Sequence, residues 1–258
     1  MLRRVIIGVF CLIICGIGRA EQPPFAYEPS LAKRISYSEV VCSGTIVKTE
    51  KTGKKEMIGG ADRDEFIAEA DVGQVFKGNL SSHAVRFRYF NFGAYPTPEF
   101  ITPPIASFDV GSRYIIFLRS RETNLEVAVP VWQMVIPLGP KLSSEAASVP
   151  PSLAGIAEEL FDSIKSQPKT LGRTATHYFS WAKEVVGKNA VPAVEYFLVS
   201  DDDLVRYQAA WWLSFREITS PVINILLDTS NNSSVETWAR SESERRLEDI
   251  HKGNWVPK

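Results

Sequence analysis

Residues 66–80 read FIAEADVGQVFKGNL, and their first half alternates apolar and polar side chains. The apolar positions of this alternation are Phe66, Ala68, Ala70 and Val72. A period of two is typical of a β-strand that buries one face and exposes the other. The stretch therefore predicts a half-buried strand.

Similar strand patterns flank this stretch on both sides. They occupy residues 40–48 (VVCSGTIVK), 85–90 (VRFRYF), 114–118 (YIIFL) and 125–138, the last offering one or two strands. Polar residues with glycine or proline predict long loops at 52–64 and 91–107. Five or six short strands within about 100 residues predict a small barrel or sandwich.

The pattern changes near residue 140. Residues 139–150 are rich in proline, serine and small side chains, which predicts a linker. Beyond them the apolar spacing becomes helical, with Ser152 as an expected cap of the first helix. The predicted helices cover residues 152–164, 178–186, 191–199, 204–215, 221–227 and 234–250.

The first twenty residues predict export. Arg3 and Arg4 precede an apolar run from Val5 to Ile17, and small residues end at Ala20, as in a cleavable signal peptide. The run is too short to span a bilayer, so no stable transmembrane anchor is expected. We therefore expect a secreted or periplasmic protein, cleaved near Ala20.

Export changes the charge and the cysteine count. Without residues 1–20 the chain keeps 26 basic and 30 acidic side chains, a net charge of −4. This charge argues against nucleic acid as a partner, since such binding needs clustered positive charge. Cys42 remains the single cysteine, and its neighbours Val40 and Val41 predict a buried thiol on a strand.

Part of the β-rich half resembles the OB-fold domain of netrin-like and tissue-inhibitor-of-metalloproteinase-like proteins. The resemblance covers residues 36–119 and is carried by Gly44-Thr45-Ile46, Val75-Phe76-Lys77-Gly78, and Phe108, Gly111 and Tyr114 to Phe117. It implies a small OB-like barrel. Inhibitors of that family chelate the enzyme's zinc through an N-terminal cysteine, but the expected N-terminus here is Glu21 and the family's disulfide cysteines are absent.

The helical half resembles HEAT-like repeats over residues 191–215 (VPAVEYFLVSDDDLVRYQAAWWLSF). The matching residues are Pro192, Asp201, Asp203, Val205, Arg206, Ala209, Ala210 and Leu213. Such helices bury their apolar faces by stacking on each other or on the barrel.

The fold class we expect is α+β, a small OB-like β-barrel followed by an α-helical HEAT-like region. Its parts are a signal peptide (1–20), a β domain (21–138), a linker (139–150), a helical region (151–250) and a C-terminal tail (251–258).

Motifs for catalysis or metal binding are missing from the sequence. His83, His177 and His251 are far apart, and the residues 201–203 (DDD) lack the spacing of a calcium loop. These aspartates are interpreted as a helix cap, with one facing Arg206. No nucleophile elbow or His-Glu-x-x-His motif occurs. We therefore expect no enzyme, no cofactor and no metal.

Two features offer binding hypotheses. Arg86 and Arg88 alternate with aromatic residues, either as a base- or sugar-stacking platform or, the favoured interpretation, as a half-buried strand with both arginines in solvent. Trp211 and Trp212 point about 100° apart on a helix. One should fill the helical core, and the other should lie at the inter-domain contact or on an exposed patch, where tryptophan is enriched at binding hot spots.

These features favour a non-enzymatic protein for protein–protein interaction or scaffolding outside the cytoplasm, with an unidentified protein partner. The alternative is a protease inhibitor or a hydrolase whose site is assembled between the two halves. A polar cleft with an adjacent base and nucleophile would favour the enzyme. An exposed apolar patch without titratable clusters would favour the binding protein.

Overall fold

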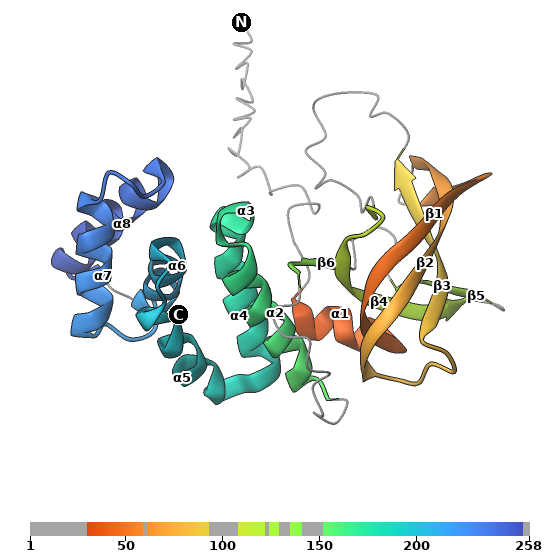
Figure 1. Ribbon diagram of the computed structural model, residues 1–258, viewed down its shortest axis with the longest axis horizontal. Coiled ribbons are helices and arrows are strands. Elements are labelled where there is room, and N and C mark those ends of the chain that lie inside the picture. The colour runs from red at the N-terminus through yellow and green to blue at the C-terminus, as the bar shows by residue number, and fades with distance from the viewer. Residues whose placement is uncertain are drawn as a thin grey trace, which may run out of the picture.

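The computed structural model describes residues 30–58, 61–92, 108–121, 124–128, 135–140 and 152–254. The fold is α+β, as predicted, with the strands in the first half of the chain and most helices in the second (Figure 1). The expected signal peptide, the C-terminal four residues and most of the predicted loop 91–107 and linker 139–150 lie outside the described residues.

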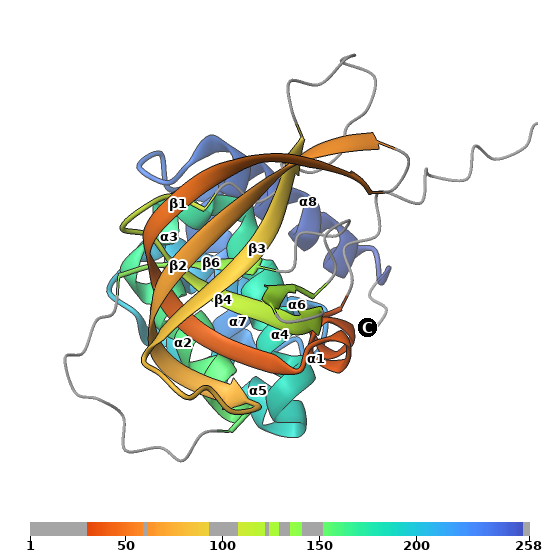
Figure 2. The same cartoon turned by 90° about the vertical axis from the view of Figure 1, so that its right-hand side faces the viewer.

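Six strands form one sheet. They are β1 (Val40–Ile58), β2 (Ala61–Lys77), β3 (Ala84–Phe92), β4 (Arg113–Arg121), β5 (Asn124–Val127) and β6 (Val135–Leu138). Hydrogen bonds join β1 to β2, β2 to β3, β3 to β5, β5 to β4 and β4 back to β1, so five strands form a closed circuit. The β3–β5 pair is parallel. Figure 2 shows the strands curving in front of the helices.

The predicted loop at 52–64 is wrong, because β1 continues to Ile58 and β2 already begins at Ala61. This part of the hairpin carries polar residues on both faces, so the apolar alternation that marks a strand is missing there. The Lys51 Nζ–Asp64 Oδ2 distance is 2.6 Å across the pair. Gly53, at φ 79°, lies within a register shift of β1, where a left-handed residue is needed.

A short helix before the sheet, α1 (Leu31–Tyr37), is absent from the sequence prediction. Seven residues are too few to establish a helical period. Ser30 caps it by accepting a hydrogen bond from the backbone N–H of Lys33. Leu31, Arg34 and Ile35 are its buried residues, so tertiary packing holds the helix in place.

Each predicted helix has a counterpart in the second half. The α-helices are α2 (Ala154–Ser166), α3 (Pro168–Leu171), α4 (Ala175–Val186), α5 (Ala190–Glu195), α6 (Asp203–Ser214), α7 (Ser220–Asn231) and α8 (Thr237–His251), with short 3₁₀ turns beside α4 and α5. The expected Ser152 cap is wrong, because α2 begins at Ala154 and has no side-chain cap. Among the described helices, none is long and apolar enough to cross a bilayer.

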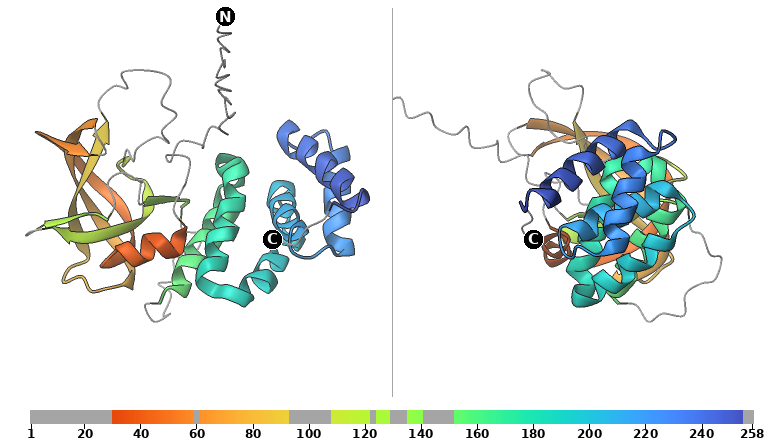
Figure 3. Two further views of the ribbon diagram at one scale, coloured as in Figure 1. Left: turned by 180° about the vertical axis from the view of Figure 1, so that it is seen from behind. Right: turned by 90° about the vertical axis from the view of Figure 1, so that its left-hand side faces the viewer.

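The two halves share one apolar core, and α1 and α2 lie between the strands and the remaining helices (Figures 1 and 3). Buried polar contacts between α2 and the sheet, called the joint below, accompany this packing. The Glu159 carboxylate of α2 accepts hydrogen bonds from Ser43 Oγ of β1 at 3.1 Å and Arg113 Nη2 of β4 at 2.6 Å. Tyr178 of α4 donates to the carbonyl of Pro137. Helix α2 is thereby fixed to the sheet by charge as well as by apolar contact.

Candidate binding pocket between helices α4 and α6

The adjacent tryptophans of α6 have different environments. Trp212 is 3% exposed, and its indole Nε1–H donates to Ser180 Oγ of α4 at 3.2 Å. Trp211 is only partly buried. The prediction that one tryptophan fills the helical core is confirmed for Trp212, and Trp211 lines a surface pocket of the helical half rather than the contact with the sheet.

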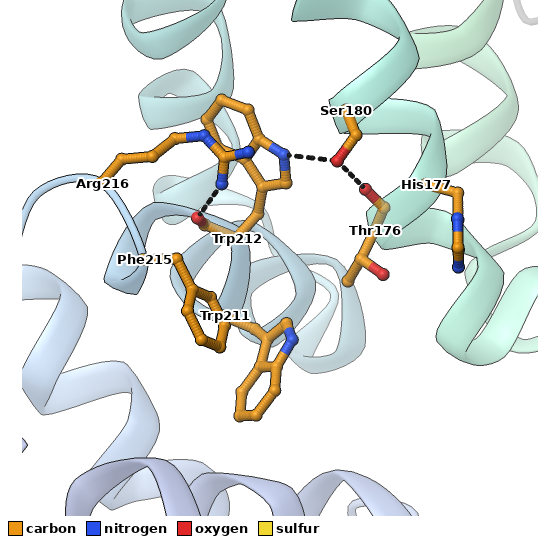
Figure 4. Close-up of a pocket in the computed structure, with 7 residues that line it drawn as sticks. All are labelled: Thr176, His177, Ser180, Trp211, Trp212, Phe215 and Arg216. Atoms are coloured by element: carbon orange, nitrogen blue, oxygen red, sulfur yellow. Dashed lines mark hydrogen bonds between the residues drawn. The ribbon is translucent and has the colours of Figure 1, made fainter. Parts of the chain in front are cut away.

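This pocket, of about 200 Å³, lies between α4 and the C-terminal end of α6 (Figure 4). Its walls combine aromatic rings, hydroxyl groups, an imidazole and a guanidinium. The residues are Thr176, His177, Ser180, Trp211, Trp212, Phe215 and Arg216. In volume it matches about one amino-acid side chain rather than the 300 Å³ or more of a drug-sized ligand site.

Arg216 supplies the positive charge of the pocket. Its guanidinium lies 3.5 Å from the ring centroid of Trp212, a cation–π contact, and its Nη1–H donates to the Trp212 carbonyl at 2.6 Å. Nε is buried without a hydrogen-bond partner. Within the described residues no carboxylate pairs with this arginine. Burial lowers its pKa to about 10, so the side chain still carries its charge at neutral pH.

The apolar wall of the pocket is an aromatic pair. Trp211 lies in the last turn of α6 and Phe215 directly follows that helix, and their ring centroids are 5.2 Å apart in an edge-to-face arrangement. Arg246 of α8 braces this pair, since its guanidinium carbon lies 4.0 Å from the Phe215 ring centroid. Its Nε–H also donates to Ser214 Oγ at 3.0 Å. The rings are therefore held in place before any ligand arrives.

The hydroxyl groups of the pocket are not arranged for nucleophilic catalysis. Ser180 Oγ donates to the carbonyl of Thr176 at 3.1 Å and accepts from Trp212. The exposed His177 makes no hydrogen bond to Ser180, so this serine has no base in contact. The pocket is suited to binding.

A larger hollow of about 410 Å³ lies on the sheet. Its lining residues are Lys54, Glu65, Ile67, Arg86, Phe87, Arg88, Asn124 and Leu125. The prediction that both arginines face solvent is wrong for Arg88, whose side chain is 18% exposed and pairs with Glu65 and Glu126. Val85, Phe87 and Tyr89 of the same strand are buried in the core, so this face of the predicted half-buried strand is confirmed. Arg86 remains exposed.

Glu126 explains the position of Arg88. Its side chain is 0% exposed, and a buried carboxylate requires cations beside it. Arg88 Nη2 lies 3.1 Å from Oε2, Arg119 Nη2 lies 2.8 Å from Oε1, and Arg121 Nη1 lies 3.5 Å from Oε2. These arginines of the sheet are therefore already engaged in an internal network.

The remaining predicted residues have structural roles. Cys42 is fully buried, as predicted, and burial raises the pKa of its thiol to about 12. Asp202 caps α6 by accepting the N–H groups of Leu204 and Val205, and Asp203 pairs with Arg206, as the cap interpretation requires. Within the residues that the structure describes, no three His, Cys, Asp or Glu side chains come together as metal ligands.

The sequence interpretation named Trp211 but missed Arg216 and Arg246. Arg216 follows Trp212 by four positions, the spacing at which helical side chains meet, and this spacing is the signal that could have found it. Comparison of the chain with models of known protein families and with curated proteins finds no match. The netrin-like and HEAT-like resemblances stay predictions.

Proposed function

We propose that this protein is an exported, non-enzymatic interaction protein that binds a protein partner through the α4–α6 pocket. The observation that carries the proposal is Arg216, a partly buried cation in an open aromatic pocket that forms no ion pair with any described carboxylate. By contrast, the buried carboxylates Glu126 and Glu159 are paired with arginines.

Two properties of the pocket support recognition of a protein. Tryptophan and arginine are the residues most enriched at the energetic centres of protein interfaces, and here Trp211 and Arg216 line the same pocket. The pocket is also preformed by contacts from α8, which lowers the entropy lost when a partner binds.

The joint between the two halves gives no support to a hydrolase assembled there. Ser43 is 1% exposed and donates to Glu159, which also accepts from Arg113. These groups satisfy one another in a closed contact, and a substrate would have to separate the halves to reach them. Their arrangement favours a structural role.

The proposal can be tested by site-specific photo-crosslinking. We would place p-benzoylphenylalanine at the exposed His177, on the pocket wall, and at Val110, a 61% exposed turn residue beside the sheet, as the matched control. Both proteins would be exposed to a cell-envelope extract of the source organism. We expect a discrete crosslinked protein for position 177 that is absent for position 110 and is lost when Trp211→Ala is added. Equal or absent crosslinking at the two positions would contradict the proposal.

A further inference from the structure

We propose that the α4–α6 pocket receives the C-terminal residue of a partner chain, with the α-carboxylate on Arg216 and an apolar or aromatic side chain against Trp211 and Phe215. This inference rests on the proposed function and specifies its ligand. It follows from the cation, the aromatic wall and the size of the pocket taken together.

The guanidinium of Arg216 has unused hydrogen-bonding capacity. Nη1 donates to the Trp212 carbonyl, whereas Nε and Nη2 make no hydrogen bond to any described residue. Stacking on Trp212 fixes the plane of the guanidinium and hence the directions of its N–H bonds. A planar guanidinium held in this way is suited to a carboxylate, which accepts parallel N–H bonds.

The chain itself offers no carboxylate to Arg216 within its described residues. Its neighbour Glu217 is exposed and makes no ion pair with it. Arg206 of α6, in contrast, is paired with Asp203. A partly desolvated cation without a counter-ion favours an incoming anion, because the anion replaces the hydration that burial removed.

The aromatic wall and the volume select among carboxylates. An aspartate or glutamate side chain would satisfy Arg216 but leave the Trp211–Phe215 pair uncovered. A C-terminal residue carries a carboxylate and an apolar side chain on one carbon, so it satisfies both in a space of about 200 Å³. Recognition of a terminal carboxylate together with its side chain is an established way of reading peptide ends.

The test uses the indole N–H signals of the ¹⁵N-labelled protein, which contains six tryptophans. Trp211 and Trp212 are assigned by the signals lost in Trp211→Phe and Trp212→Phe. The probes are acetyl-Gly-Phe with a free carboxylate, the same peptide as its C-terminal amide, and phenylacetate as a free small acid. We expect the acid peptide to shift the Trp211 signal with a Kd on the order of a millimolar or tighter, and the amide to bind at least about tenfold more weakly.

Variants locate the carboxylate. Arg216→Gln should remove the preference for acid over amide, whereas the control Arg206→Gln, which removes a cation of α6 outside the pocket, should retain it. If Arg216→Gln does not fold, the acid and amide peptides on the unaltered protein still decide the matter.

Each outcome has a separate meaning. Equal binding of acid and amide, or no shift with either, would overturn the inference. Phenylacetate binding as tightly as the acid peptide would assign the pocket to a free carboxylate and also overturn it. The crosslink at position 177 is independent of these titrations, so it can persist when the inference fails, and the proposed function then stands without its ligand.

Discussion

The sheet and the helical half place their arginines in opposite situations. On the sheet, Arg88, Arg119 and Arg121 surround the buried Glu126. Glu65 and Glu56 supply further carboxylates to Arg88 and Arg121, so each arginine has a partner within the protein. In the helical half, Arg216 stacks on Trp212, and no carboxylate in the described part of the chain forms an ion pair with it. The role of an arginine therefore depends on whether a carboxylate lies beside it. An arginine paired with a carboxylate supports the fold, and one without such a pair remains available to a ligand.

Volume alone would favour the hollow on the sheet as the binding site. The hollow on the sheet is about 410 Å³ and the α4–α6 pocket about 200 Å³. However, Arg88 in the larger hollow already has two carboxylate partners. The smaller pocket is the better candidate because its cation has unused hydrogen-bond donors and its walls are aromatic.

The largest effect is expected for Glu126→Gln, which leaves three arginines around a neutral buried amide. We expect the free energy of unfolding to fall by about 3–5 kcal/mol, as when one partner of a buried ion pair is removed. Urea unfolding monitored by circular dichroism measures it. The control is Glu69→Gln at the exposed Arg86 pair, with a change within about 0.5 kcal/mol. If both variants lost a similar amount of unfolding free energy, the buried network would contribute no more than an exposed ion pair.

A smaller effect is expected at the joint between the halves. Glu159→Gln should lower the free energy of unfolding by about 2–3 kcal/mol, because Arg113 loses its charged partner. Hydrogen exchange should show faster exchange in α2 and the adjoining part of β4. The exposed neighbour Glu158 provides the matched control, Glu158→Gln. Unchanged protection in α2 would mean that apolar contact alone holds the halves together.

The buried Cys42 of the sheet should make the free energy of unfolding depend on pH in alkaline solution. Its thiol has a pKa of about 12 in the fold, against 9.0 when exposed, so the folded state holds the proton more tightly. The stabilisation is complete below pH 9 and is lost as pH rises towards 12. By about pH 10.5 the protein should lose about 2 kcal/mol more stability than Cys42→Ala. If the unfolding free energies of the unaltered protein and Cys42→Ala fell in parallel over this pH interval, the raised pKa of Cys42 would be refuted.

The smallest effect concerns the helical half. Asp202→Ala removes the oxygen that caps the backbone N–H groups of Leu204 and Val205, and should lower the free energy of unfolding by about 1 kcal/mol. Asp202→Asn should retain most of the cap and act as the control. Thermal unfolding of the two variants provides the measurement, and equal midpoints would show that the cap contributes nothing.

Local patterns in the sequence predicted most of the fold. Alternation marked β2 and β3, and helical spacing marked α2 and α4 to α8, because one-sided burial leaves a periodic pattern in each. The four-residue helix α3 was not predicted. Gly78, where the strand pattern of residues 66–77 ends, has φ 78°, and a Cβ there would lie 2.3 Å from the Glu39 carbonyl oxygen. The outer part of β1 was missed because solvent meets both of its faces and erases the alternation.

The candidate site was only half predictable. Trp211 drew attention as one of two adjacent tryptophans, and burial of Trp212 followed from helical geometry. Arg246 depends on tertiary packing, since it reaches Ser214 and Phe215 from α8, and Arg246 lies 32 residues after Ser214 in the chain. Whether an arginine finds a carboxylate is decided by contacts between distant segments. No local pattern separates Arg88 from Arg216.

The long strand β1 has a consequence for solubility. Only its first six residues, Val40 to Thr45, pair with β4, so the same edge of β1 is unpaired from Val47 onward within the described residues. An open edge is a template on which another chain can add a strand. Lys48, Lys51, Lys54 and Lys55 lie along this part of the strand, and lysines at an edge disfavour such addition. These lysines are thus expected to keep copies of the protein from associating edge to edge.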